Sequence, residues 1–341
     1  MSSNEYHSLL AEYIIRLRYE KTLHGFSSLS LFYTFGELDR YWRTYNIGIS
    51  DLKKEAYDKW FDSLDHDNLS RKTIYAKAAA YRQLMIYLSQ LGKIVFIPSL
   101  PRKNEHKFVP YIFTHKEMQM LFEASDKLTL RSLISTNFMF SIPVLLRLLY
   151  STGIRLGEAL SLRNQDVDFA NKRIVLNNTK NRHQRIVPIN QSLLSVLEQY
   201  TSYRDRLRCQ NLTGKDAYFF VSNKGVQGTN AAVERGFRKL LRKANIPYKG
   251  HFAGPRVHDL RHTACVHAMM KMVSLGIDLY TCLPIISKFM GHIDVYATEH
   301  YLRITQKVYP QVINQQAGLS SQIQRVIMEG YPVNNLIEDE G

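Results

Sequence analysis

Residues 257–263 read Val-His-Asp-Leu-Arg-His-Thr, and this short stretch says more about the fold and the chemistry than any other part of the chain. It opens a helix predicted over His258 to Val273. His258 and Arg261 are three residues apart, so they project from one face of that helix. One is a donor that titrates near neutral pH and the other is a permanent cation. The pair suits a phosphate, although it is too common to identify a site by itself.

The same stretch has the spacing of a helical zinc pair, formed by His258 and His262, which would indicate a metalloprotease. Asp259 stands where such a motif needs a glutamate base. Arg261 would place a fixed cation beside the metal. These two residues disfavour the zinc alternative.

Three other segments hold residues suited to a phosphodiester. Residues 151–158 read Ser-Thr-Gly-Ile-Arg-Leu-Gly-Glu, residues 179–185 read Thr-Lys-Asn-Arg-His-Gln-Arg, and residues 290–292 read Met-Gly-His, followed by Glu-His-Tyr at 299–301. Arg155 lies at a predicted helix start, where backbone N–H groups and a guanidinium would hold an anion together. A surface arginine is the plainer interpretation of that residue alone, so the combination of segments carries the argument.

The order and spacing of these segments resemble the tyrosine recombinase, or phage integrase, family across nearly the whole chain. The family's motif positions fall on Arg155 and its downstream acid Glu158, the hairpin lysine Lys180, His258, Arg261, His292, and Tyr301, nine residues after that histidine. The resemblance implies a catalytic domain of mixed α and β structure. It also implies that the N-terminal helices form a core-binding domain that clamps DNA.

In the mechanism that this resemblance implies, Tyr301 attacks the phosphorus and releases a 5'-hydroxyl, which leaves a 3'-phosphotyrosyl link. Because that ester stores the bond energy, neither ATP nor a metal is implied. Arg155 and Arg261 neutralise the nonbridging oxygens as negative charge builds. His258 and His292 donate hydrogen bonds to the phosphate or assist proton transfer.

Two further roles come from the same resemblance, and two assignments have near competitors. Lys180 protonates the leaving oxygen, and Glu158 orients its neighbours. Lys172 and Arg182 flank the same predicted hairpin as Lys180, so a shift of strand register would change the choice. Tyr296 competes for the role of nucleophile, but its offset from the Gly-His motif is wrong.

The chain is predicted to be mainly α-helical with a small antiparallel β-sheet. Helical periodicity runs through residues 6–91, and the stretch 97–110 holds three prolines, basic residues and no periodicity. Thr114 and Glu117 then form a capping box. The predicted domains are a helical DNA-binding domain over 1–97, a linker over 98–110, a catalytic domain over 111–312, and a tail over 313–341 suited to exchange between protomers.

Within these domains the local signals predict individual elements. In the first domain, Ser50 caps a helix over 51–64, and Ser70 opens another helix that Gly92 ends. In the second domain, the predicted strands are 173–176 and 184–188, and the predicted helices are 116–124, 142–151, 191–208, 231–244, 258–273, 283–290 and 296–304. The segment 269–283 is longer than the helix-turn-helix expected from the resemblance and is predicted to lie on the surface.

Composition narrows the partners and the location of the protein. The net charge is +15 and the pI is about 9.6, which favours polyanionic partners such as nucleic acid. No apolar run approaches the roughly 20 residues of a membrane span, and the opening residues lack a secretory signal. We therefore expect a cytoplasmic, nucleoid-associated protein. The three scattered cysteines suit neither a disulfide framework nor a zinc site.

Two helix faces are candidates for contact with DNA. Ser70, Thr73, Lys77 and Tyr81 share one face of the helix that Ser70 opens, opposite an apolar face of Ile74, Ala78, Met85 and Leu88. The second candidate is a basic stripe formed by Arg235, Arg238, Lys239, Arg242 and Lys243. A solvated outer face explains each set nearly as well as a phosphate contact does.

The leading hypothesis is a site-specific recombinase or integrase of a mobile element. It would act on double-stranded DNA as a homotetramer on paired sites, with accessory DNA-bending proteins as further partners. One rival is a type IB topoisomerase-like enzyme that uses the same chemistry to relax supercoils. Another is a DNA-binding protein that makes no use of its catalytic residues, which the full set of six motif residues argues against.

Overall fold

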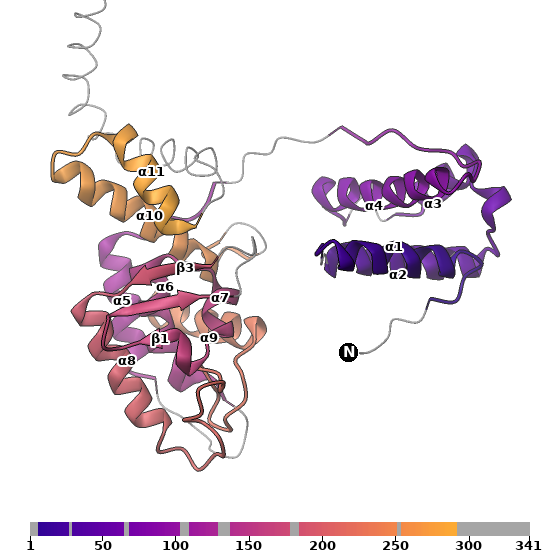
Figure 1. The fold of residues 1–341 in the computed structure, drawn as a ribbon. Helices are drawn as coiled ribbons and strands as arrows, with labels where there is room; N and C mark the ends of the chain where they lie inside the picture. Colours follow the sequence, from indigo (N-terminus) through magenta and orange to yellow (C-terminus); the bar gives the residue numbers. More distant parts are fainter. Residues whose placement is uncertain are drawn as a thin grey trace, which may run out of the picture. The chain divides into compact units, whose positions relative to one another are not determined.

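The computed structural model describes residues 6–26, 29–64, 68–102, 109–128, 137–177, 184–250 and 254–291 (Figure 1). It divides the chain into two compact units, Met1–Phe108 and Val109–Gly341. The boundary falls within the segment 98–110, where the sequence places a linker. No described helix combines the length and the apolar character that crossing a bilayer requires.

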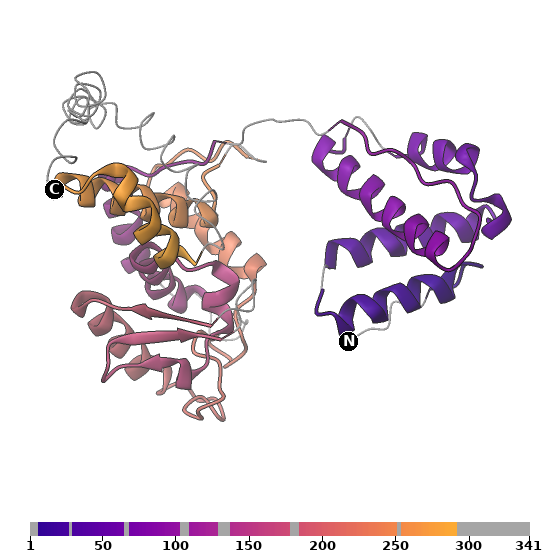
Figure 2. The ribbon, with the colours of Figure 1, turned by 45° about the horizontal axis from the view of Figure 1, so that its top comes forward.

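The first unit is a bundle of helices (Figure 2), and many of its buried core residues are aromatic. Its helices are α1 (Ala11–Leu23), α2 (Leu29–Thr44), α3 (Lys54–Asp62) and α4 (Arg71–Gln90), with a 3₁₀ helix at Ile49–Asp51. Trp60 stacks on Tyr81 with 4.8 Å between ring centroids, and Trp42 meets Tyr81 edge-on at 5.9 Å. Large buried rings of this kind stabilise a small bundle through the apolar area they remove from water.

Helix α4 confirms part of the sequence prediction and corrects part of it. The Ser70 side chain accepts a hydrogen bond from the Thr73 N–H at 3.1 Å, as a helix cap should. The predicted apolar face is buried, but Tyr81 is only 1% exposed. Its assignment to an outward face was therefore wrong, because its ring fills the space between α2 and α3. The cap predicted at Ser50 was also wrong, since α3 begins at Lys54, after the separate 3₁₀ turn.

The second unit is mostly helical and carries one small antiparallel sheet, which confirms the predicted fold class (Figure 1). The strands β1 (Val167–Asp168), β2 (Arg173–Leu176) and β3 (Arg185–Pro188) pair in the order β1-β2-β3. The helices are α5 (His115–Asp126), α6 (Ile142–Thr152), α7 (Leu156–Ser161), α8 (Gln191–Arg204), α9 (Asn230–Lys243), α10 (Val257–Ser274) and α11 (Leu279–Met290).

Helix α6 is the central element of this unit. Its sequence, Ile-Pro-Val-Leu-Leu-Arg-Leu-Leu-Tyr-Ser-Thr, is apolar on nearly every side, which is typical of a helix surrounded by protein. Helices α5, α8, α9 and α10 all pack against it. Leu145 and Leu148 are fully buried. The C-terminal end of α6, and the turn that follows it, are therefore held on several sides.

Helices α10 and α11 lie side by side and form a smaller core of their own (Figures 1 and 2). Met269 on α10 and Leu283 on α11 are both buried in it. The prediction that 269–283 is a surface insertion was thus wrong at both ends of the segment. Helix α11 also starts four residues before the predicted Leu283, because the Asp278 side chain caps it by accepting from the Thr281 N–H at 2.9 Å.

Candidate active site

The turn between α6 and α7 places the first candidate residue. Gly153 ends α6 with a φ of 62°, a left-handed conformation that favours glycine. A Cβ built on Gly153 would lie 2.6 Å from the Met290 sulfur, so the turn also needs glycine for its close contact with the end of α11. Arg155 follows in an extended conformation as the N-cap of α7, at the helix start that the sequence predicts.

Arg155 is held by the acid three residues further on. Its backbone N–H donates to Glu158 Oε2 at 2.9 Å, and its Nη1 donates to Oε1 at 2.9 Å. Among the backbone N–H groups expected to hold an anion at this helix start, that of Arg155 is thus engaged by Glu158. The Arg155 side chain is 23% exposed. Its other guanidinium N–H groups have no hydrogen-bond partner among the residues that the structure describes.

A second arginine, which the sequence analysis did not assign, completes this network. Arg185 on β3 donates from Nη1 to Glu158 Oε1 at 3.2 Å and from Nη2 to Oε2 at 2.9 Å. The available signal was strand alternation, because Arg185 shares a face of β3 with Val187, which is 1% exposed. An arginine on the buried face of a strand requires a carboxylate partner.

The two arginines determine the charge state of Glu158, whose side chain is 3% exposed. Burial by itself would raise the pKa of this carboxyl. The hydrogen bonds from Arg185 and Arg155 and the positive charge of Arg185 outweigh burial, so the pKa lies below its ordinary value of 4.5. Glu158 is therefore a buried carboxylate shared by two cations.

Arg185 also touches the end of α11. Gly291 ends that helix with a φ of 66°. A Cβ built on Gly291 would lie 2.6 Å from Arg185 Cζ and 2.8 Å from its Nε. The Nε atom is buried and has no hydrogen-bond partner within the described part of the chain. The guanidinium thus packs directly against the backbone of the residue that precedes His292.

Arg261 connects the same two turns from the other side. It is 3% exposed, and its guanidinium donates to the Gly153 carbonyl through Nη1 and to the Met290 carbonyl through Nη2, the latter at 2.7 Å. Arg261 therefore joins α10 to the α6–α7 turn and to the end of α11. The structure places this predicted site residue next to the backbone that leads into Arg155.

His258 lies one turn before Arg261 on α10 and is exposed to solvent. Partial desolvation of its ring, followed by the positive charges of Arg261, Arg256 and Arg155, lowers its pKa below the ordinary value of 6.5. His258 is thus neutral at pH 7. It borders a groove of about 390 Å³, lined by residues of α9, α10 and the start of α7.

Three of the predicted catalytic residues, Lys180, His292 and Tyr301, lie outside the described residues, as do Tyr296 and the tail 313–341. Arg155, His258 and Arg261 lie within them, and the structure brings these three together. Arg261 bonds to the carbonyl of Gly153, two residues before Arg155, and His258 lies one turn before Arg261 on α10, where the charges of Arg155 and Arg261 lower its pKa.

The zinc alternative gains no support from the described residues. The rings of His258 and His262 are perpendicular, with 4.8 Å between their centroids. No group of three or more histidine, cysteine or acidic side chains that could hold a metal ion occurs in the part of the chain searched. The three cysteines are free thiols rather than disulfide partners.

The candidate DNA-contacting residues of the second unit form an exposed basic face on α9. Arg235, Arg238, Lys239 and Arg242 are all exposed, while Val233, Phe237 and Leu240 on the opposite face are buried. Arg238 Nη2 lies 3.8 Å from Glu234 Oε2, and the Arg238 guanidinium lies 5.5 Å from the ring centroid of Tyr248. The stripe therefore faces away from the core, as the sequence predicts.

The candidate DNA-contacting residues of the first unit are less available for contact with a phosphate. Ser70 is exposed but its hydroxyl hydrogen-bonds with the Thr73 hydroxyl at 2.7 Å. The Lys77 side chain is only 13% exposed and forms an ion pair with Glu37 of α2. Of these three residues, Lys77 already has an acidic partner within its own bundle.

The site consists of two arginines that share one buried carboxylate, with Arg261 and His258 close to Arg155, in a mainly helical fold with a small antiparallel sheet. Residues 112–307, more than half of the chain, match the model of the phage integrase family. The chain belongs to this family, whose members are tyrosine recombinases.

Individual relatives agree with the family assignment. A Sinorhizobium fredii protein named as an integrase/recombinase, y4rB, is 29% identical over 224 residues, which cover 66% of this chain and 69% of that protein. The tyrosine recombinase XerC of Oceanobacillus iheyensis is 27% identical over 76% of this chain and 80% of its own length. The Tn1549 transposon integrase, solved with transposon right end DNA, has the same fold, with a TM-score of 0.63, 17% identity, and coverage of 86% of this chain and 94% of that one.

Proposed function

We propose that this chain is a site-specific recombinase of a mobile element, which cleaves and rejoins double-stranded DNA through a 3'-phosphotyrosyl link to Tyr301. The observation that carries the proposal is the meeting of Arg155, His258 and Arg261 at one place, beside the end of α11. These residues come from segments about a hundred positions apart in the sequence. Membership of the phage integrase family supports the same reaction.

In the proposed cleavage step, the Tyr301 oxygen attacks the phosphorus and its proton passes to solvent with the aid of His258 or His292, while the bond from phosphorus to the 5'-oxygen breaks. Lys180 gives a proton to the leaving 5'-oxygen. A second 5'-hydroxyl then attacks the phosphotyrosine, which rejoins the strands and releases Tyr301. Since the number of phosphoester bonds is unchanged, the reaction needs no ATP.

Arg155 has the properties required of a phosphate ligand. It is partly exposed, its position is fixed through Glu158, and it retains guanidinium N–H groups for an incoming anion. Arg261 contributes a second positive charge from α10. Together they stabilise the charge on the nonbridging oxygens in the transition state, so no metal is required for that purpose.

His258 and His292 act as hydrogen-bond donors to the phosphate or as aids to proton transfer. The lowered pKa of His258 keeps its imidazole neutral at pH 7, so one ring nitrogen donates while the other accepts. Glu158 has a different role. With a lowered pKa and arginine donors on both oxygens, it orients Arg155 and does not transfer protons.

The DNA is proposed to bind to both units. In the second unit the contacts come from the basic face of α9, and in the first unit from Ser70, Thr73 and Lys77 on α4. We also propose that four copies assemble on paired sites, aided by DNA-bending proteins, and that the protein acts in the cytoplasm at the nucleoid. The DNA in the Tn1549 integrase structure supports a DNA substrate here.

The experiment that tests this proposal is covalent capture from a pool of nicked duplexes with a randomised half-site. A nick just beyond the cleavage point lets the 5'-hydroxyl fragment diffuse away, so the adduct accumulates. The protein is incubated with the pool in the presence of EDTA and without nucleotide, and adducts that resist detergent are recovered and sequenced. We expect a defined DNA sequence to be enriched and Tyr301 to be the modified residue.

Tyr301→Phe should give no adduct and should bind the recovered DNA with unchanged affinity. Tyr296→Phe is the matched control and should retain adduct formation. Adducts that persist in Tyr301→Phe, or the absence of adducts from the whole pool, would contradict the proposal. Relaxation of any supercoiled plasmid by a monomer would favour the topoisomerase-like alternative.

A further inference from the structure

We propose that Arg185 is a positioning residue for strand cleavage. It holds the Arg155 guanidinium in place through Glu158, and it supports the turn at Gly291 that leads into His292. The inference rests on the proposed function, since it adds a residue to that same reaction. None of the roles proposed above for the chemical step belongs to Arg185.

The two arginines share both oxygens of one carboxylate. Each oxygen of Glu158 accepts one hydrogen bond from Arg155 and one from Arg185, over distances of 2.9 to 3.2 Å. The two bonds from Arg185 run from a planar fork to both oxygens, which fixes the plane of the carboxylate. Arg155 contributes only one guanidinium N–H to the same carboxylate. With its backbone N–H, Arg155 also reaches both oxygens, so Arg155 and Arg185 determine the orientation of Glu158 together.

The freedom of Arg155 depends on this carboxylate. A long side chain at the surface loses conformational freedom when it binds a ligand, and the loss opposes binding and reaction. Glu158 restricts Arg155 before any phosphate arrives. If Arg185 were absent, Glu158 would be a buried carboxylate with half of its charged partners removed. Only the two bonds from Arg155 would then hold the carboxylate, and the Arg155 guanidinium would be less firmly fixed.

Arg185 also supports the end of α11. Arg185 packs against Gly291, where a Cβ would come within 2.6 Å of its Cζ, and Arg261 binds the carbonyl of the preceding Met290 at 2.7 Å. Two arginines from different elements thus fix two successive residues. His292 follows directly in the sequence. Arg185 thus contacts both Glu158 and Gly291.

The burial of Arg185 separates positioning from binding. Its side chain is 14% exposed, and all of its described hydrogen bonds go to Glu158. A change at this residue should therefore slow the chemical step and leave DNA affinity nearly unchanged. A residue that only stabilises the fold would not slow the chemical step while leaving DNA affinity unchanged.

The test uses Arg185→Lys in the full chain, with the DNA recovered by covalent capture. Lysine keeps the positive charge but lacks the two planar N–H donors that bond both oxygens of Glu158. We expect the single-turnover cleavage rate at saturating protein to fall about 30-fold, within the range known for misplaced catalytic groups, and the dissociation constant to change less than about two-fold. The matched control is Arg173→Lys on β2, whose arginine pairs with Asp168 at 2.9 Å on the exposed side of the same sheet. It should cleave at the wild-type rate.

A double-variant cycle distinguishes positioning from general stabilisation. If Arg185 acts through Arg155, then adding Arg185→Lys to Arg155→Lys should slow cleavage by less than about three-fold, because the group to be positioned is already lost. Losses that multiply would contradict the route from Arg185 through Glu158 to Arg155. Should Arg185→Lys unfold, Glu158→Gln tests the same link with nearly unchanged shape, and it should be about ten-fold slower than the wild type.

The outcomes separate this inference from the proposal on which it rests. A wild-type protein that forms no adduct overturns the proposed function and this inference with it. A wild-type protein that cleaves, together with an Arg185→Lys or Glu158→Gln variant that cleaves equally fast, overturns the role of Arg185 alone.

Discussion

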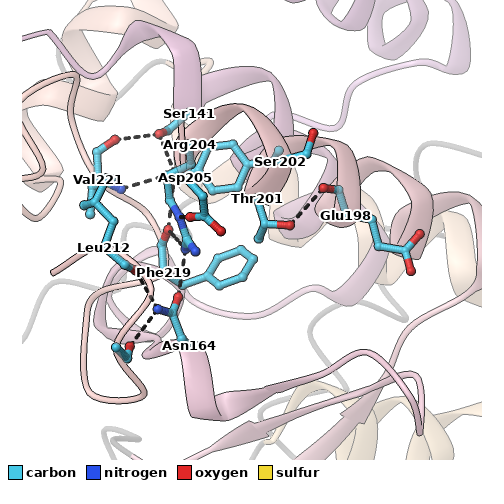
Figure 3. A network of polar contacts seen from close by, with 12 residues as sticks. Ser141, Asn164, Glu198, Thr201, Ser202, Arg204, Asp205, Leu212, Phe219 and Val221 are labelled. Atoms are coloured by element: carbon cyan, nitrogen blue, oxygen red, sulfur yellow. Dashed lines mark hydrogen bonds and ion pairs between the residues drawn. The ribbon is translucent and has the colours of Figure 1, made fainter. Parts of the chain in front are cut away.

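Two clusters of the second unit each contain a buried arginine, and they use its charge differently. In the first, Arg204 at the end of α8 donates to Asp205 at 2.7 Å, to Asn164 Oδ1 at 2.8 Å and to the Phe219 carbonyl at 3.0 Å (Figure 3). Its guanidinium also lies 5.2 Å from the centroid of the Phe219 ring. Arg204 is 3% exposed. These hydrogen bonds go to the next residue along the chain, to a short 3₁₀ helix and to the segment that carries Phe219.

In the second cluster, Arg185 and Arg155 share Glu158, and Arg155 is exposed enough to reach solvent. One cluster thus neutralises its charge internally, and the other keeps a net positive charge at the surface. The difference teaches that burial of an arginine does not by itself indicate function. What matters is whether donors remain after the internal partners are counted, because only those donors can hold a ligand.

The largest effect that would sharpen this contrast is expected at Arg155. Arg155→Gln should lower the single-turnover cleavage rate about 1000-fold, equivalent to about 4 kcal/mol of transition-state stabilisation. The reason is the loss of a fixed positive charge beside the phosphate. The measurement is the rate of adduct formation on a nicked duplex, with DNA affinity determined in parallel. A rate within ten-fold of the wild type would place Arg155 in the same structural class as Arg204.

The second prediction concerns stability instead of rate. Arg204→Met should lower the free energy of unfolding of the second unit by about 3 kcal/mol, because the Phe219 carbonyl and Asn164 would lose a buried donor. Cleavage measured at a temperature where the protein is folded should change less than two-fold. Helix content, followed in urea by circular dichroism, reports the unfolding.

The chain offers an internal control for that experiment. Its two tryptophans, Trp42 and Trp60, both lie in the first unit, so their fluorescence should report an unchanged transition. Arg206→Met, at an exposed neighbouring position, should change stability by less than about 0.5 kcal/mol. If Arg206→Met destabilises as much as Arg204→Met, the buried network is not the cause.

A similar contrast between open and enclosed groups occurs on α10, and it predicts a pH dependence. His258 is exposed, whereas His267 is buried, stacks on His115 with 4.0 Å between centroids, and bonds with the Tyr150 hydroxyl at 2.8 Å. Burial, with a smaller contribution from His115, lowers the pKa of His267 from 6.5 to about 4. Between these pH values the unfolded chain binds a proton that the folded chain does not.

The stability contributed by neutral, buried His267 is therefore fully present above pH 6.5, and it is lost as the pH falls toward 4. Between pH 7 and pH 5 the loss should be about 2 kcal/mol. It is measured as the difference between the wild type and His267→Asn, which keeps an acceptor near Nδ1. An identical pH dependence in both proteins would show that His267 is protonated as easily when folded as when unfolded.

The smallest effect is expected on the basic face of α9. Lys239→Ala should weaken DNA binding about three- to ten-fold at 0.1 M salt, and it should reduce the salt slope of the logarithm of affinity by about 0.9, which corresponds to one lost phosphate contact. Lys271→Ala, at an exposed position on α10, is the control. Equal behaviour of the two variants would indicate that the face of α9 is only solvated.

Much of the second unit was predictable because its signals are local. The helix from His115 follows from the capping box of Thr114 and Glu117, which the structure contains, and the strands at 173–176 and 185–188 follow from β-branched residues. Predictions failed where a distant contact decided the outcome. Tyr81 looked like part of an outward helix face, yet Trp60 on another helix covers it.

The site residues likewise divide into those that local sequence marks and those that only distant contacts reveal. The spacing of His258 and Arg261 sufficed to place both on one helix, and the chain confirms that helix. Arg185 was passed over because strand alternation with Val187 is its only local mark, and that signal does not identify a partner. Its partner, Glu158, is 27 residues away, and its neighbour Gly291 is more than a hundred residues away.

The sequence by itself determined the family, the helical character of both units and the identity of the candidate catalytic residues, because motif spacing and hydrophobic periodicity are properties of the chain. The tertiary structure alone decided which charges meet. A buried carboxylate is stable only where cations surround it, and their supply at Glu158 depends on how α7, β3 and the end of α11 pack together. Such packing is a collective result of the core, which no single segment encodes.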